Sequence, residues 1–155
     1  MRRFAILGAA LLCLLFAPTQ AGQPREWRVV CDQNVATVEP LCHIALFTQD
    51  QENGAWLGVA VQILNGSHEI QVTSGGESYR SAEIDVALDT TIITDYCYGS
   101  YCVFVHAENL VAQFKSAGGA KIRLYDDAPS AMIEKRVTFR GFTKAYEEYL
   151  DRIRN

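Results

Sequence analysis

Short runs of alternating apolar and polar residues occur along most of this chain, and they constrain its fold more than any other feature of the sequence. A period of two residues is that of a β-strand with one buried face. In residues 56–64 one set of alternate positions is apolar and the other is small or mixed, which predicts a central strand. Asn65-Gly66 follows at once and predicts a two-residue hairpin, because both residues tolerate positive φ. The return strand then carries Ile70 and Val72.

The same pattern recurs in seven further segments, so that about nine strands are expected. These segments are residues 27–31, 42–47, 84–88, 90–94, 102–105, 122–124 and 137–139. Many short strands with few helices predict a mainly β protein, a β-sandwich with helical additions.

Two helices are expected. The apolar residues Ala107, Leu110, Val111 and Phe114 have the spacing of one helix face, and Gly118-Gly119 follows as a stop signal. A C-terminal helix is expected to begin at Thr143 as its N-cap and to carry apolar residues as far as position 153. The first helix is thus short and internal, and the second closes the chain.

Residues 1–21 have the pattern of a secretory signal peptide. Two arginines precede an uncharged apolar run, residues 4–17, and a proline and a small-x-small ending at Ala21 follow. The run, at about 14 residues, is shorter than the roughly 20 residues of a transmembrane helix. We therefore expect an exported protein whose mature part, residues 22–155, is a single domain without a transmembrane segment.

The charge balance argues against nucleic acid as a partner. The chain has 14 Lys+Arg and 18 Asp+Glu, a formal charge of −4, and loss of the leader with its two arginines makes it more negative. Its basic residues are scattered singly and form no stripe that could displace counterions from phosphates. An anionic membrane surface is disfavoured on the same grounds.

Four cysteines lie in the expected mature chain: Cys31, Cys42, Cys97 and Cys102. An even number in an exported chain predicts two disulfides, for which three pairings are possible. Pairing within Cys31–Cys42 and within Cys97–Cys102 is favoured because each pair is close in sequence. A zinc site or a redox centre is less favoured, because neither pair has the spacing of a zinc knuckle or of a thiol-disulfide oxidoreductase.

No set of catalytic residues is recognisable, so we expect no enzyme, no cofactor and no metal. His43, His68 and His106 are far apart in the sequence, and no Gly-x-Ser-x-Gly motif is present. Gly75-Gly76 lacks the lysine and helix that follow a phosphate-binding loop.

Three tyrosines surround the late cysteines and are the residues most suited to binding a partner. Tyr96, Tyr98 and Tyr101, held by a small disulfide ring, would offer rigid amphipathic area at low entropic cost. The alternative is that one or two of them cap the core of the sandwich.

Several of these features occur together in the same order as in one known family. They are Trp27-Arg28-Val29-Val30-Cys31, Cys42, the pair Cys97 and Cys102, the helical residues 110–114 with Gly118-Gly119, and Phe139-Arg140-Gly141-Phe142-Thr143-Lys144-Ala145. In this order, which spans nearly the whole mature chain, the sequence resembles the invasion-associated locus B family. The resemblance implies an immunoglobulin-like β-sandwich, exported by a Gram-negative bacterium to the periplasm or outer membrane. It brings no catalytic residues, and the cysteines are structural.

Some members of that family are linked with entry into host cells, which gives the leading hypothesis for function. The chain would be a non-enzymatic envelope protein that contacts another envelope protein or a host-surface protein. The runner-up is a periplasmic inhibitor of a hydrolase such as a protease or lysozyme, since a disulfide-stapled β module with a rigid loop suits that task. An enzyme is the third hypothesis.

Overall fold

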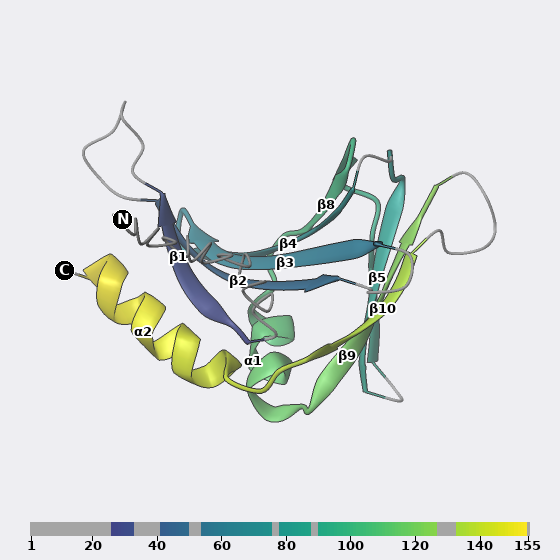
Figure 1. Cartoon of the computed structure of the whole chain (residues 1–155). Coiled ribbons are helices and arrows are strands. Elements are labelled where there is room, and N and C mark those ends of the chain that lie inside the picture. The colour runs from purple at the N-terminus through teal and green to yellow at the C-terminus, as the bar shows by residue number, and fades with distance from the viewer. Residues whose placement is uncertain are drawn as a thin grey trace, which may run out of the picture.

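The computed structural model describes residues 26–32, 41–49, 54–75, 78–87, 90–126 and 133–154. The strands in these residues are β1 Arg28–Asp32, β2 Leu41–Gln49, β3 Trp56–Leu64, β4 Ser67–Ser74, β5 Ser81–Ala87, β6 Thr90–Thr94, β7 Cys97–Tyr98, β8 Tyr101–Phe104, β9 Gly119–Tyr125 and β10 Ile133–Thr138. The helices are α1 Glu108–Ser116 and α2 Phe142–Arg154 (Figure 1). The expected signal peptide, residues 1–21, lies outside the described residues, as does Leu88 of an expected strand.

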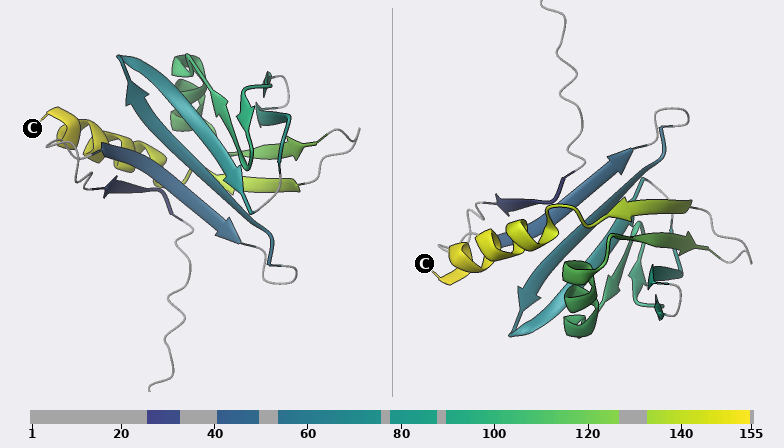
Figure 2. Two further views of the ribbon diagram at one scale, coloured as in Figure 1. Left: turned by 90° about the horizontal axis from the view of Figure 1, so that it is seen from above. Right: turned by 90° about the horizontal axis from the view of Figure 1, so that it is seen from below.

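The strands form two antiparallel sheets. The larger sheet has six strands in the order β1-β2-β3-β4-β8-β7, and the smaller has four in the order β10-β9-β5-β6. Figures 1 and 2 show the strands of the smaller sheet crossing those of the larger sheet at a steep angle, with α1 and α2 on the same side of β2, β3 and β4. The expected mainly β, sandwich-like fold with a short internal helix and a C-terminal helix is confirmed.

The hairpin between β3 and β4 forms as its turn residues predict. Asn65 and Gly66 have φ values of 51° and 81°, and Leu64 lies directly opposite Ser67. This two-residue turn fixes the register, so the apolar residues of both strands face the same side.

The core lies between the sheets and is closed at one end by the helices. Alternate residues of the larger sheet, including Leu57, Val59 and Ile70, are fully buried or nearly so. Ile84 and Ile122 of the smaller sheet are also fully buried, and α1 adds Leu110, Val111 and Phe114. Each such side chain contributes about 1.5–3 kcal/mol relative to leaving it exposed.

Trp27 links the two sheets and both helices. It precedes β1 of the larger sheet, and its Nε1 donates a hydrogen bond of 2.8 Å to the carbonyl oxygen of Thr138 in the smaller sheet. Its ring centroid lies 6.1 Å from that of Phe114 in α1 and 4.9 Å from that of Phe142 in α2. Elements from both ends of the chain therefore meet at this one side chain.

Two local predictions differ from the structure. Helix α2 begins at Phe142, so the expectation of Thr143 as N-cap is wrong. Gly141, with φ of 83°, turns the chain from β10 into the helix, and its carbonyl oxygen accepts a bond of 3.0 Å from the N–H of Ala145. The two-residue strand β7 was not expected either, because it is too short to show an alternating pattern.

Candidate functional site

The two disulfides join Cys31 to Cys42 and Cys97 to Cys102, which confirms the pairing favoured from the sequence. The first connects neighbouring strands β1 and β2, and the second connects β7 and β8. Because Cys102 is fully buried, the second bond fastens the short β7–β8 hairpin to the core.

The three tyrosines selected from the sequence lie on this hairpin and at its entrance. Tyr98 and Tyr101 are opposite one another on β7 and β8, with ring centroids 5.7 Å apart. Tyr96 lies beside Val103, whose N–H donates to the Tyr96 carbonyl oxygen at 2.8 Å. Tyr96 and Tyr98 are 56% and 58% exposed, whereas Tyr101 is partly buried. The hairpin therefore presents two large aromatic side chains to solvent.

One row of residues crosses five strands of the larger sheet on the side away from the core. The strand register places Phe47, Gly58, Thr73, Tyr101 and Tyr98 directly opposite one another in that order. A parallel row contains Arg28, Ala45, Ala60, Gln71 and Val103. We call this surface the open face: Ala45, Phe47, Trp56, Gly58, Ala60, Gln71, Thr73, Tyr98, Tyr101 and Val103. Except for the buried Gly58, these residues are partly or largely exposed, and both helices lie on the opposite side of the sheet (Figure 1).

Trp56 lies along the surface of the open face. A methyl group on Gly75 would come within 2.7 Å of the indole Nε1, and one on Gly58 within 3.7 Å of Cζ3. These two atoms are at opposite ends of the indole, so the ring extends over both glycines. Phe47 stacks on it, with centroids 5.2 Å apart and ring planes at 26°. The absence of a side chain at Gly75 leaves room for the indole.

Sequence reasoning found the tyrosines of the open face but missed Phe47 and Trp56. Both are at positions of mixed character in their strands, and only the strand register shows that they adjoin each other and the tyrosine row. A detectable signal was the small residues Gly58 and Ala60, which alternate with large core residues of β3.

The outer face of the smaller sheet is charged. The Arg123 guanidinium hydrogen-bonds to Glu83 and, at 2.8 Å, to Glu134, and Lys121 lies 3.7 Å from the same Glu134. The hydrogen bond from Arg123 lowers the pKa of Glu134 below its ordinary value, and that bond likewise raises the pKa of Arg123. Burial, followed by the hydrogen bond that its hydroxyl donates to Glu83, raises the pKa of Tyr125.

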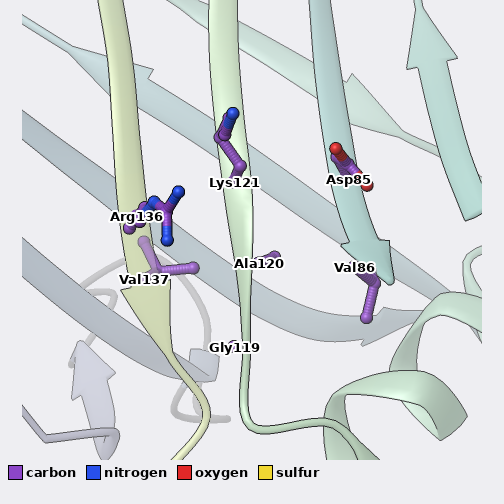
Figure 3. A pocket seen from close by; sticks show the side chains of 7 residues that line it. All are labelled: Asp85, Val86, Gly119, Ala120, Lys121, Arg136 and Val137. Atoms are coloured by element: carbon purple, nitrogen blue, oxygen red, sulfur yellow. The ribbon is translucent and has the colours of Figure 1, made fainter. Parts of the chain in front are cut away.

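A shallow hollow of about 340 Å³ lies at one end of this charged face (Figure 3). It is lined by Asp85, Val86, Gly119, Ala120, Lys121, Arg136 and Val137. Figure 3 shows the three charged side chains on neighbouring strands β5, β9 and β10. Its walls carry charges of both signs beside small apolar groups, and the described residues that line it include no histidine, cysteine or hydroxyl side chain.

A polar cluster lies where β4 meets the start of α1. The Ser67 hydroxyl lies 3.1 Å from His106 Nδ1 and donates to Glu108 Oε1 at 2.9 Å. The backbone N–H of His68 donates to the same carboxylate at 3.0 Å. The bond from His68 is the main reason that the pKa of Glu108 falls to about 2. The sequence did not indicate that His68 and His106 come together here; His43 lies on β2.

The geometry of this cluster differs from that of a catalytic triad. In a triad the acid orients the histidine, and the histidine takes the serine proton. Here the Ser67 hydroxyl donates its hydrogen bond to Glu108 directly, and a carboxylate with a pKa of about 2 is a weak base at neutral pH. The same residues join secondary-structure elements, since the Ala107 N–H donates to the His68 carbonyl oxygen at 2.9 Å and His68 Nε2 lies 2.7 Å from the Tyr146 hydroxyl. We interpret the cluster as a structural joint of β4, α1 and α2.

Two other kinds of feature are absent from the described part of the chain. Within those residues, no three or more His, Cys, Asp or Glu side chains are grouped so that they could hold a metal ion. Neither of the helices found there has the length and apolar character needed to span a membrane.

The fold and the disulfides define a disulfide-stapled, sandwich-like β protein. No known family profile and no curated protein sequence matches the chain. Its structure is similar to the crystal structure of invasion associated protein B from Bartonella henselae, with a TM-score of 0.64 and 16% sequence identity. The match covers 83% of this chain and 94% of that chain. The likeness shows that the two proteins share a fold.

Proposed function

We propose that this chain is an exported, non-enzymatic envelope protein of the invasion-associated locus B type that acts through protein–protein contacts in host-cell association. We place it in the periplasm or at the outer membrane. The observation that carries the proposal is the disulfide-anchored β7–β8 hairpin, which presents Tyr96 and Tyr98 more than half exposed. The shared fold with invasion associated protein B supports the choice of protein class.

The hairpin suits protein recognition for two physical reasons. When a partner covers exposed aromatic side chains, their apolar area is removed from water, which favours binding. Tyrosine also offers a hydroxyl for hydrogen bonding. The disulfide holds the hairpin in one conformation, so few rotatable bonds lose their freedom on binding and the entropic cost is small. Two further exposed apolar side chains flank this segment in the sequence: Ile93 is 66% and Val105 is 44% exposed.

The same hairpin also supports the runner-up function, inhibition of a periplasmic protease or lysozyme. A rigid exposed loop on a stable β module can enter the cleft of a hydrolase. Titration of the purified protein against such enzymes distinguishes the two functions, and absence of inhibition at micromolar concentrations would remove this one.

Site-specific crosslinking in the native envelope tests the proposal. A photoreactive amino acid replaces Tyr98 in one variant and the exposed Glu134, on the outer face of the smaller sheet, in a matched control. We expect position 98 to capture a discrete partner that position 134 does not capture, and a Tyr96→Ala/Tyr98→Ala variant to lose host-cell binding. The same background of captured proteins at both positions would contradict a role for the hairpin.

A further inference from the structure

We propose that a second copy of this chain pairs with β6, so that two four-stranded sheets join into one continuous sheet across a two-fold axis. This dimer goes beyond the protein contacts of the β7–β8 hairpin. The proposal rests on the uncharged, unpaired edge of β6 and on the match that β6 makes with itself.

The edges of the two sheets differ in how they are protected against pairing. The larger sheet ends at β1, against which α2 packs (Figure 1), and at β7, which has only two residues. The smaller sheet ends at β10, which carries Glu134, Lys135 and Arg136 in succession, and at β6. A covering helix, a very short strand and charged side chains are common means of preventing edge-to-edge association. The edge of β6 has none of these protections.

The residues of β6 are suited to pairing with another strand. They are Thr90-Thr91-Ile92-Ile93-Thr94, all β-branched, with no charge and no proline. Ile93 is 66% exposed, more than any other large apolar side chain of the described residues. Within those residues no strand pairs with the outer edge of β6, and Thr91, Ile92 and Ile93 form no backbone hydrogen bond with a loop. Every second residue of such an edge directs its N–H and C=O away from the sheet, where a further strand can bind them.

The edge is also fixed before a second copy binds. The hydroxyl of Thr94 donates to the Val103 carbonyl oxygen at 2.8 Å and accepts from the N–H of Tyr96 at 3.2 Å. Ile92 packs against the core on the inner side of the sheet. A strand that is already ordered loses little conformational freedom when it pairs.

A second copy fits this edge because β6 can pair with itself. In an antiparallel pair with the two-fold axis at Ile92, Ile93 lies opposite Thr91 of the second copy, and the reverse contact follows by symmetry. The exposed Ile93 then gains a β-branched neighbour on the outer face. The partly buried Ile92 meets its own counterpart on the inner face.

The charges of the outer face are complementary in this register. The strand register of the smaller sheet forms one row of Glu134, Arg123, Glu83 and Ile93, and a second row of Thr91, Asp85, Lys121 and Arg136. The first row has one acidic side chain in excess, and the second has one basic side chain in excess. Pairing about Ile92 joins the first row of one copy to the second row of the other, so each joined row has three acidic and three basic side chains. A strand of another protein would bond the same backbone groups, but this balance of charge follows by symmetry for a second copy.

Sedimentation velocity of the mature protein between about 1 µM and about 1 mM tests the proposal. We expect a reversible dimer whose population rises with concentration. Ile93→Lys places a charge on the edge and should weaken dimerisation by about tenfold or more. Ile153→Lys, at an exposed apolar position on α2, is the matched control and should dimerise like the native protein.

Cysteine substitutions test the register of the pair. A mixture of Thr91→Cys and Ile93→Cys proteins brings the two new cysteines directly opposite each other, at a Cα separation of about 4.5–5.5 Å that a disulfide can bridge. In either variant alone the new cysteines are diagonal neighbours about 7–8 Å apart, beyond the usual reach of a disulfide. We therefore expect mild oxidation to give covalent dimers in the mixture and few in either variant alone. This test decides the question even if Ile93→Lys does not fold.

A protein that stays monomeric at every concentration would overturn the proposal. So would a dimer that a natively folded Ile93→Lys leaves intact, a dimer that Ile153→Lys also abolishes, or equal amounts of covalent dimer in the mixture and in the single variants. If the protein stays monomeric and Ile93→Lys abolishes partner capture from position 98, the edge binds a strand of that partner and not a second copy. Capture from position 98 does not require a dimer, so the two proposals can fail separately.

Discussion

The outer faces of the two sheets obey the same rule of alternation and differ in chemistry. In the larger sheet, residues such as Ala60, Gln71 and Tyr101 alternate with buried core residues, and the outward residues near β7 and β8 are small, neutral or aromatic; Arg28 and Glu69 lie farther along the same face. In the smaller sheet the outward set includes Glu83 and Arg123, which form an ion pair. Alternation therefore determines which residues face outward. The types of those residues determine whether the face is suited to remain solvated or to bind a partner.

The two faces also depend on different forces. Ion pairs across neighbouring strands hold the charged face, and such pairs weaken as salt screens them. The open face is fixed by register, by the glycine at position 75 that leaves room for Trp56 and by a disulfide at its β7–β8 end. Salt should therefore weaken the charged face of the smaller sheet, and a reductant should loosen the β7–β8 end of the open face.

The largest loss of stability is expected at Trp27, which contacts both sheets and so belongs to neither outer face. Trp27→Ala should lower the free energy of unfolding by about 3–5 kcal/mol, because it leaves a cavity among Phe114, Phe139 and Phe142. Chemical denaturation followed by circular dichroism measures this loss. Trp56→Ala, on a partly exposed side chain, is the control and should cost much less. Equal losses in the two variants would show that Trp27 does not link the sheets.

An intermediate effect is expected from the disulfide that joins β7 to β8. Cys97→Ala/Cys102→Ala should lower the free energy of unfolding by about 2 kcal/mol, because the unfolded chain regains the entropy of a short loop. The loss should be the same in low and high salt. The double substitution should also reduce crosslinking from position 98, since the hairpin is no longer fastened to the core. Cys31→Ala/Cys42→Ala is the matched control and should leave that crosslinking intact.

The smallest effect is expected from the charged face. Arg123→Met should lower the denaturation midpoint slightly at low salt, and the difference from the native protein should shrink in 1 M salt. The stability of the variant should also depend less on pH than that of the native protein. Folding lowers the pKa of Glu134 below 4.5, so this group stabilises the protein above about that pH, and the contribution falls as pH drops further. A salt-independent loss would contradict the view that ion pairs hold this face.

Much of the fold could be predicted because its signals are local. The Asn65-Gly66 turn, the spacing of Leu110, Val111 and Phe114, and the closeness of each cysteine pair all act within a few residues. The pair Glu148 and Arg152, four residues apart, likewise forms an ion pair of 2.6 Å on α2.

The candidate site could be predicted only in part because it depends on which strands are neighbours. Tyr98 and Tyr101 are close in the sequence, but Phe47 reaches them only through the order β2-β3-β4-β8-β7. Strand order is set by contacts between distant segments, and alternation within a strand does not encode it. The start of α2 was misplaced for a related reason, since the positive φ of Gly141 comes from the turn out of β10.

The bond between Trp27 and Thr138 joins positions 111 residues apart, and this separation has a consequence for the timing of folding. If the chain crosses a membrane N-terminus first, Thr138 emerges 111 residues after Trp27, and Phe142 follows it. The joint between the sheets cannot close until nearly the whole polypeptide is across, because contacts of long sequence separation form only when both segments are present. The emerging chain would then stay open long enough for Cys31, Cys42, Cys97 and Cys102 to be oxidised before α2 docks.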